Sequence, residues 1–232
     1  MDMNGKISKI DIKDANTEFG YYENCIEAIF SDIESRWGEI RNGIIEALNN
    51  KKQDRVVLKL PDDTLDIIKK YFALCVIRSE ALVKEVQRKS VFMDCLENSP
   101  ANAVVYSYMR RPEVVDNLVK NKDYSIMVAP KERLILPQSG FYAVKRDSHF
   151  DIIIPISPKY VIRLTYDNVY DENKHRVIYG IQESDLEQLN KHAIMFEVKH
   201  NQRAIYSRDE SILVHYKEYM LKLKGQADEI QV

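Results

Sequence analysis

Glutamate and arginine side chains at helical spacing are the first residues in this sequence that could carry chemistry. Glu27 and Glu34 are seven residues apart, so they share one face of a helix, with Phe30 between them. At a rise of about 1.5 Å per residue their backbones lie about 10 Å apart, which is too far for an easy single-metal pair. Arg78 falls inside an apolar stripe, where a charge must pair with a carboxylate or reach an anion. We therefore expect Arg78 to be buried against the first helix and paired with Glu27 or Glu34, and we favour a structural ion pair over a catalytic one.

A histidine between two aspartates is the second candidate group. Asp147, His149 and Asp151 lie within the segment RDSHFD. Alternation along a strand would put His149 and Asp151 on one face, where they could ligate a metal or act as a base. The simpler interpretation is a solvated turn that enters a strand, and we favour it. Asp151 nevertheless joins the two glutamates and the arginine as a catalytic candidate.

Several familiar signatures do not occur in the sequence. It contains no phosphate-binding loop, no GxGxxG, no GxSxG and no HExxH, which argues against the common nucleotide-dependent and hydrolase classes. The cysteines, Cys25, Cys75 and Cys95, are widely spaced and odd in number, so we expect reduced thiols. We expect no cofactor and no metal site.

The charge balance limits the kinds of partner. Lys and Arg number 34 and Asp and Glu number 36, so no sequence-wide field favours nucleic acid or an anionic membrane. The fourteen tyrosines could stack on bases, but Arg110-Arg111 is the only tight basic pair near them, and we regard nucleic-acid binding as the weaker reading. No long apolar run predicts a membrane span or a signal peptide. We therefore expect a cytoplasmic protein with a protein partner.

The elements that would position these residues begin with helices. Apolar residues recur at steps of three and four over residues 18–50, and Trp37 lies on this stripe. Residues 55–60 suit a short strand or an extended link. Pro61 and the aspartates after it open a second helix that reaches about Ser90, and further helical turns follow to about Val119.

From Tyr124 the pattern changes to short, β-like runs separated by turn residues. The expected strands span residues 124–128, 133–136, 141–145, 150–154, 160–165 and 177–179. The run from Ile152 to Ile154 suits a strand that is buried on both faces, and the corner from Pro155 to Pro158 should be structural. Short connections make most neighbours antiparallel. Capping boxes at Ser184 and Ser207 predict two final helices.

Together these patterns predict the α+β class, with a helical N-terminal half followed by a mainly antiparallel sheet and two C-terminal helices. We expect one domain over residues 1–232, with a helical part over about residues 18–121 and a sheet-containing part over about residues 122–224.

Short motifs in the same order resemble the uncharacterised domain-of-unknown-function family 4238 (DUF4238). They are Glu27-x6-Glu34 with Trp37, FALCVIRSEAL, RLILPQSGF, IIPISP, LEQLN ending in Asn190, and AIYSRDE, and they cover about residues 19–219. The sequence lacks the family's N-terminal HxxPxxYL stretch, and Gln138 stands where the family's Ser-Asp-Asn-Pro motif has its acidic residue. The resemblance implies no known activity. It makes Gln138 and Asn190 candidate binding residues, and the two departures favour an inactive or repurposed relative.

Two functions from different classes fit these observations. The first is a binding or regulatory protein of the bacterial or phage cytoplasm that acts through a macromolecular partner. The second is a hydrolase or nuclease-like effector enzyme that uses Glu27, Glu34, Arg78 and Asp151 in one cleft. Saturable stabilisation by Mg²⁺ or Mn²⁺ would favour the enzyme.

Overall fold

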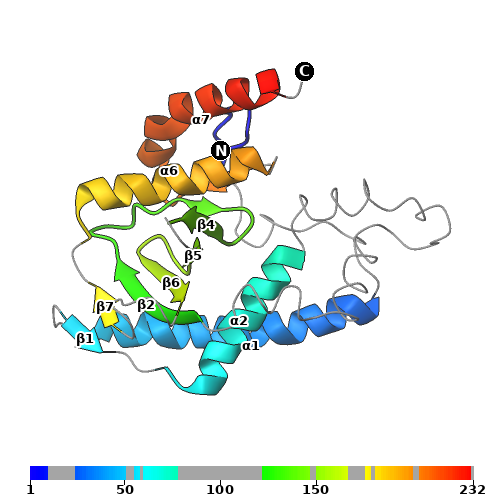
Figure 1. The fold of residues 1–232 in the computed structure, drawn as a ribbon, viewed down its shortest axis with the longest axis vertical. Coiled ribbons are helices and arrows are strands. Elements are labelled where there is room, and N and C mark those ends of the chain that lie inside the picture. The colour runs from blue at the N-terminus through cyan, green and yellow to red at the C-terminus, as the bar shows by residue number, and fades with distance from the viewer. Residues whose placement is uncertain are drawn as a thin grey trace. The chain divides into compact units, whose positions relative to one another are not determined.

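The computed structural model describes residues 1–9, 24–50, 55–57, 60–77, 122–146, 150–166, 176–178, 181–200 and 204–230 (Figure 1). The chain divides into two compact units. A helical unit comprises residues 10–50 and 60–120, and a sheet unit comprises residues 1–9, 51–59 and 121–232. The expectation of one domain stays a prediction.

The helical unit contains α1 (Asn24–Asn50) and α2 (Asp62–Ile77), which pack against each other. The apolar stripe of α1 is buried at Phe30, Trp37, Ile44 and Leu48, as its spacing predicts. The Trp37 ring stacks on Tyr71 of α2, with ring centroids 4.7 Å apart and planes 18° apart. These two predicted helices are confirmed within the described residues.

The sheet unit is built on six strands in the order β1-β7-β2-β6-β5-β4. They are β1 (Arg55–Val57), β2 (Lys122–Val128), β4 (Tyr142–Lys145), β5 (Phe150–Pro155), β6 (Tyr160–Tyr166) and β7 (Arg176–Ile178). All neighbours are antiparallel except β2 and β7, which are parallel. The predicted, mainly antiparallel sheet is therefore confirmed.

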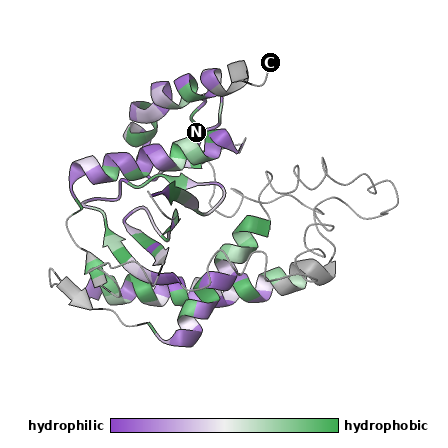
Figure 2. Cartoon of the chain, in the orientation of Figure 1, coloured by the Kyte–Doolittle hydropathy of each residue, from purple (hydrophilic) through white to green (hydrophobic). Residues whose placement is uncertain are grey.

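Two helices follow the strands, α6 (Glu183–Lys199) and α7 (Glu210–Ile230). In Figure 1, α6 lies along one side of the sheet next to β4, and α7 lies on the far side of α6. Figure 2 shows strands that are largely hydrophobic and helices that mix hydrophobic with hydrophilic residues. The predicted α+β class is confirmed.

One core joins this sheet face to the two helices. Tyr142, Val144, Ile153 and Val161 contribute the strand side chains, and Ile194 is among those from α6. Burial of Ile152, Ile153 and Ile154 confirms that β5 is covered on both of its faces. Within the described residues, every helix is too short or too polar to cross a lipid bilayer.

The ends of three predicted elements differ from the structure. Of the strand predicted at residues 133–136, only Leu136 belongs to a strand, β3 (Leu136–Pro137), which pairs with β8 (Ile205–Tyr206) in a separate two-stranded sheet. Helix α6 begins after Gln182 because the Gln182 carbonyl accepts from the backbone N–H of Asp185 and of Leu186, so Ser184 lies inside the first turn. Helix α7 opens after Asp209, whose Oδ1 accepts from the Ser211 N–H at 2.9 Å, and this cap replaces the expected one at Ser207.

Candidate functional site

The candidate site forms where three neighbouring strands bring charged side chains to one end of the sheet. Asp151 is the second residue of β5, and its backbone pairs with Val144 of β4. On its other side, the register that pairs Ile152 with Leu164 places Thr165 of β6 opposite Asp151. These side chains share the face that carries Ile153, because successive strand residues point to opposite faces.

The side chain of Asp151 is fully buried and forms ion pairs with two arginines. The Nε atom of Arg146, just after β4, lies 3.0 Å from Asp151 Oδ2, and the Nε atom of Arg163 on β6 lies 3.1 Å from the same oxygen. The side chain of Asp151 is 0% exposed, whereas those of Arg146 and Arg163 are 53% and 19% exposed. The carboxylate is therefore paired with two cations that extend from it toward solvent.

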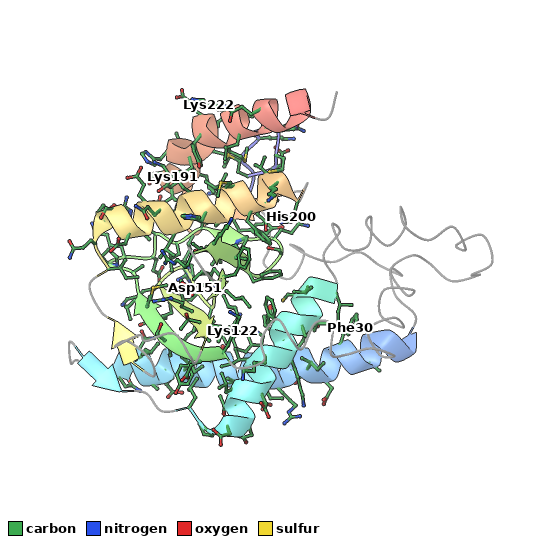
Figure 3. All side chains as sticks on the ribbon, in the orientation of Figure 1. Phe30, Lys122, Asp151, Lys191, His200 and Lys222 are labelled. Atoms are coloured by element: carbon green, nitrogen blue, oxygen red, sulfur yellow. The ribbon has the colours of Figure 1, made fainter. Side chains whose placement is uncertain are left out.

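A lysine reaches the same end of the sheet from the opposite face, because Lys122 pairs with Tyr166 rather than with Thr165, and we call Lys122, Arg146 and Arg163 the basic cluster. Lys122 is the first residue of β2, and its Nζ donates to the carbonyl of Phe150 at 2.6 Å, one residue before Asp151. Figure 3 labels Lys122 and Asp151, which lie close together at this end of the sheet. Burial lowers the pKa of Lys122, and the negative charge of Asp151 partly offsets this effect.

The electrostatics of the site keep Asp151 ionised. Burial alone would raise the pKa of Asp151, but the charge of Arg163, the hydrogen bond of Arg146 and the neighbouring Thr165 hydroxyl outweigh it and hold the pKa below its ordinary value. A carboxylate that is stabilised in this way is a weak base at neutral pH.

Two further polar residues of β2 lie on the same face. Asp123 pairs with Thr165 and Ser125 pairs with Arg163 across the β2–β6 ladder. The Ser125 hydroxyl is buried and has no hydrogen-bond partner among the described residues. On this face two guanidinium groups lie beside two carboxylates, Asp123 and Asp151, whereas Lys122 is buried on the opposite face, so an anion would bind through the donor groups of the arginines rather than through an excess of positive charge.

The binding candidates Gln138 and Asn190 hold backbone segments in place. Gln138 Oε1 accepts from the backbone N–H of Ala204 at 2.9 Å. Asn190 is buried on α6, where its Oδ1 accepts from the Ile135 N–H at 2.9 Å and its Nδ2 donates to the Arg133 carbonyl at 3.0 Å. Both contacts are structural, and neither residue belongs to the basic cluster.

Most of the remaining candidates lie outside the described residues. Arg78, Asp147, His149 and the side chain of Glu27 are among them, so the expected pairing of Arg78 with a glutamate stays a prediction. Glu34 lies on α1 of the helical unit and is partly exposed.

Sequence reasoning missed every arginine and lysine of the basic cluster. Arg163 could have been found, because it interrupts the apolar strand YVIRLTY, and a charge in such a run needs a partner. Among the described residues no group of three or more His, Cys, Asp or Glu side chains could hold a metal ion. The geometry suits anion binding through the guanidinium groups of Arg146 and Arg163.

No family model matches the chain, and neither the search of curated proteins nor that of solved structures gives a match. The resemblance to family 4238 therefore stays a prediction, and the functional argument depends on the site itself.

Proposed function

We propose that the chain is a cytoplasmic binding or regulatory protein that recognises an anionic group, a carboxylate or a phosphate, on a protein partner through the basic cluster. The observation that carries this proposal is the pair of guanidinium Nε atoms on one buried carboxylate oxygen, Oδ2 of Asp151.

This arrangement suits a preorganised anion receptor. A guanidinium is planar, and its donors match carboxylate and phosphate oxygens in a two-pronged geometry. Arg146 and Arg163 both use Nε to reach Asp151, and a guanidinium has a second donor edge, formed by its two Nη groups, that can bind another anion. Asp151 thus acts as a positioning residue, which lowers the entropy lost when the arginines bind a ligand.

An exposed aromatic side chain next to the cluster supports a macromolecular partner. Phe150 directly precedes Asp151, and its side chain is 53% exposed. Alternation directs it toward the opposite face of β5, at the same end of the sheet as the basic cluster. A partner segment that passes around this end would bury the ring and place an anionic side chain on the arginines.

The alternative is a hydrolase or nuclease-like effector that uses Asp151 together with Glu27, Glu34 and Arg78. Such an enzyme needs Asp151 to act as a base or as a metal ligand. The lowered pKa of Asp151 and its two guanidinium partners favour binding over this chemistry. Saturable stabilisation by Mg²⁺ or Mn²⁺ that is lost in Asp151→Asn would favour the enzyme instead.

Fluorescence anisotropy with three labelled peptides tests the proposed function. One peptide is rich in Asp and Glu, one carries phosphoserines, and one is a neutral peptide of Gln and Ser. We expect at least one anionic peptide to bind, the neutral peptide to show no binding, and Arg146→Gln to weaken binding about tenfold or more, since a lost charge-assisted contact costs about 1.5–3 kcal/mol.

The matched control is Arg208→Gln. Arg208 is also exposed and also pairs with a carboxylate, Glu132 at 2.9 Å, but it lies outside the basic cluster. We expect this variant to bind like the wild type. Equal binding of all three peptides, or equal loss in both arginine variants, would show that only general charge attraction is present.

A further inference from the structure

A second buried carboxyl group lies away from the basic cluster, on α6. Glu197 is 0% exposed and faces the turn at residues 138–140, which connects β3 to β4. The turn closes with a bond from the Gly140 N–H to the Pro137 carbonyl at 3.1 Å, and Gly140 has a φ of 78°, a conformation that favours glycine.

Ser139 connects this turn to Glu197. The Ser139 Oγ lies 2.6 Å from the Phe141 carbonyl oxygen and also forms a hydrogen bond with Glu197 Oε1. The Ser139 backbone N–H points at the same oxygen, with 3.4 Å between the nitrogen and Oε1. Glu197 Oε2 is buried and has no hydrogen-bond partner among the described residues.

Counting protons assigns the direction of these bonds. The Phe141 carbonyl can only accept, and a serine hydroxyl has one hydrogen to donate. If Ser139 donates to Phe141, the proton between Ser139 and Glu197 must belong to Glu197. If Glu197 is ionised, the Ser139 hydrogen is drawn to the carboxylate, and the Phe141 carbonyl loses this donor.

The surroundings of Glu197 favour the protonated form. Burial raises the pKa of Glu197 to about 7, although hydrogen bonds from Ser139 and from the Gln138 backbone oppose the shift. From β8, Tyr206 is the titratable side chain that interacts with Glu197, and its own pKa is raised by burial and then by this carboxyl group. On α6 itself, Lys199 is two residues after Glu197, and His200 follows directly after the helix; burial lowers the pKa of His200.

We infer that Glu197 and Ser139 form a proton-dependent latch, which holds the 138–140 turn against α6 when Glu197 is protonated. Ionisation releases the turn because the charged carboxylate, which is fully buried and whose Oε2 has no hydrogen-bond partner among the described residues, must reach water. Hydrogen bonds connect the turn to the strand β8. Gln138 binds the backbone N–H of Ala204, and the N-terminal ammonium of Met1 donates to the Ile205 carbonyl at 2.7 Å. Release of the turn should therefore also loosen the pairing of β3 with β8.

The sign of the pH dependence follows from the raised pKa of Glu197. The folded state binds the proton more tightly than the unfolded chain, whose glutamate has the ordinary pKa of 4.5. The stabilising effect of the latch is therefore complete below that value and is lost as the pH rises through about 7.

Hydrogen exchange measured at about pH 5.5 and about pH 8.5, and corrected for intrinsic rates, tests the latch. In the wild type we expect protection of the backbone amides at residues 138–141 and 204–206 to fall about tenfold or more at the higher pH, because each unit of raised pKa is a tenfold factor. Glu197→Gln is neutral at both pH values and can donate to Ser139 Oγ, so its protection should not change with pH.

The control is Glu187→Gln, a change at an exposed residue of the same helix, which should keep the wild-type fall in protection. Equal wild-type protection at both pH values, or the same fall in Glu197→Gln, would overturn the latch. If Glu197→Gln does not fold, the carboxyl carbon chemical shift of Glu197 in the wild type decides the question. A midpoint near 7 supports the latch, and a midpoint near 4.5 contradicts it.

Discussion

The Nε atom of Arg163 lies 3.1 Å from Oδ2 of Asp151. This ion pair links β6 to β5 in a sheet whose other residues are mostly apolar. The carboxylate is fully buried and the guanidinium is only slightly exposed. Such a pair adds little net stability when both partners are present, because desolvation opposes the attraction, but removal of one partner leaves a charge without compensation. The ion pair therefore holds the Arg163 side chain in one position, as a preorganised binding site requires.

Asp151→Asn should lower the free energy of unfolding by about 3–5 kcal/mol, since it leaves the partly buried Arg163 guanidinium without its carboxylate. Urea denaturation followed by circular dichroism measures this loss. Glu132→Gln removes an equally ionic but exposed partner, that of Arg208, and should change stability by less than about 0.5 kcal/mol. A similar small effect in Asp151→Asn would mean that the pair is not buried in solution.

Acid should remove the contribution of the Asp151 ion pairs to the free energy of unfolding. The Asp151 pKa lies below its ordinary value of 3.8, so the stabilisation is present above that value and is lost as the pH falls through the lower, folded-state pKa. Denaturation curves of wild type and Asp151→Asn should therefore converge in strong acid and stay apart near neutrality. Curves that keep a constant separation down to the lowest pH would show that Asp151 does not titrate as described.

Asn190→Ala should lower the free energy of unfolding by about 1–3 kcal/mol, because the buried Ile135 N–H and the partly buried Arg133 carbonyl would each lose a hydrogen-bond partner. Gln188→Ala, at an exposed position of the same helix, is the control and should stay within about 0.5 kcal/mol of the wild type. Thermal unfolding compares the two variants. Equal stability of both would assign Asn190 a role other than holding the loop before β3.

Trp37→Ala should destabilise the helical unit by about 3–5 kcal/mol, since it removes the aromatic ring that stacks on Tyr71 and leaves a cavity between α1 and α2. Circular dichroism at 222 nm follows the change because the variant has no tryptophan to observe. Trp37→Phe keeps most of the packing and should lose clearly less stability. If both variants behave like the wild type, the two helices do not depend on this stack.

The helices and strands that are encoded by the spacing of apolar residues along the sequence could be predicted. The stripe through Phe30 and Trp37 follows from steps of three and four, and the buried run from Ile152 to Ile154 follows from its composition. The start of α6 was misplaced, because the residue before the helix, Gln182, makes no side-chain capping hydrogen bond and so leaves no signal in the sequence.

The site depends on contacts that no local pattern encodes. Asp151 was selected for its neighbour His149, whereas the structure pairs it with Arg146 and Arg163 across three strands. That outcome follows from strand order and register, which the sequence leaves open. The contact between Ser139 and Glu197 spans 58 positions and joins a turn to a helix, so only the tertiary structure reveals it.

The melting temperature in phosphate compared with chloride, at equal ionic strength and pH, tests the central claim most directly. An anion that binds only the folded protein must stabilise it, by an amount that grows with the logarithm of the anion concentration above the dissociation constant. We predict a melting temperature that rises with phosphate concentration for the wild type and for Arg208→Gln, and a much smaller rise for Arg146→Gln. Equal melting temperatures in the two salts, or an equal rise in both arginine variants, would contradict an anion site at the basic cluster.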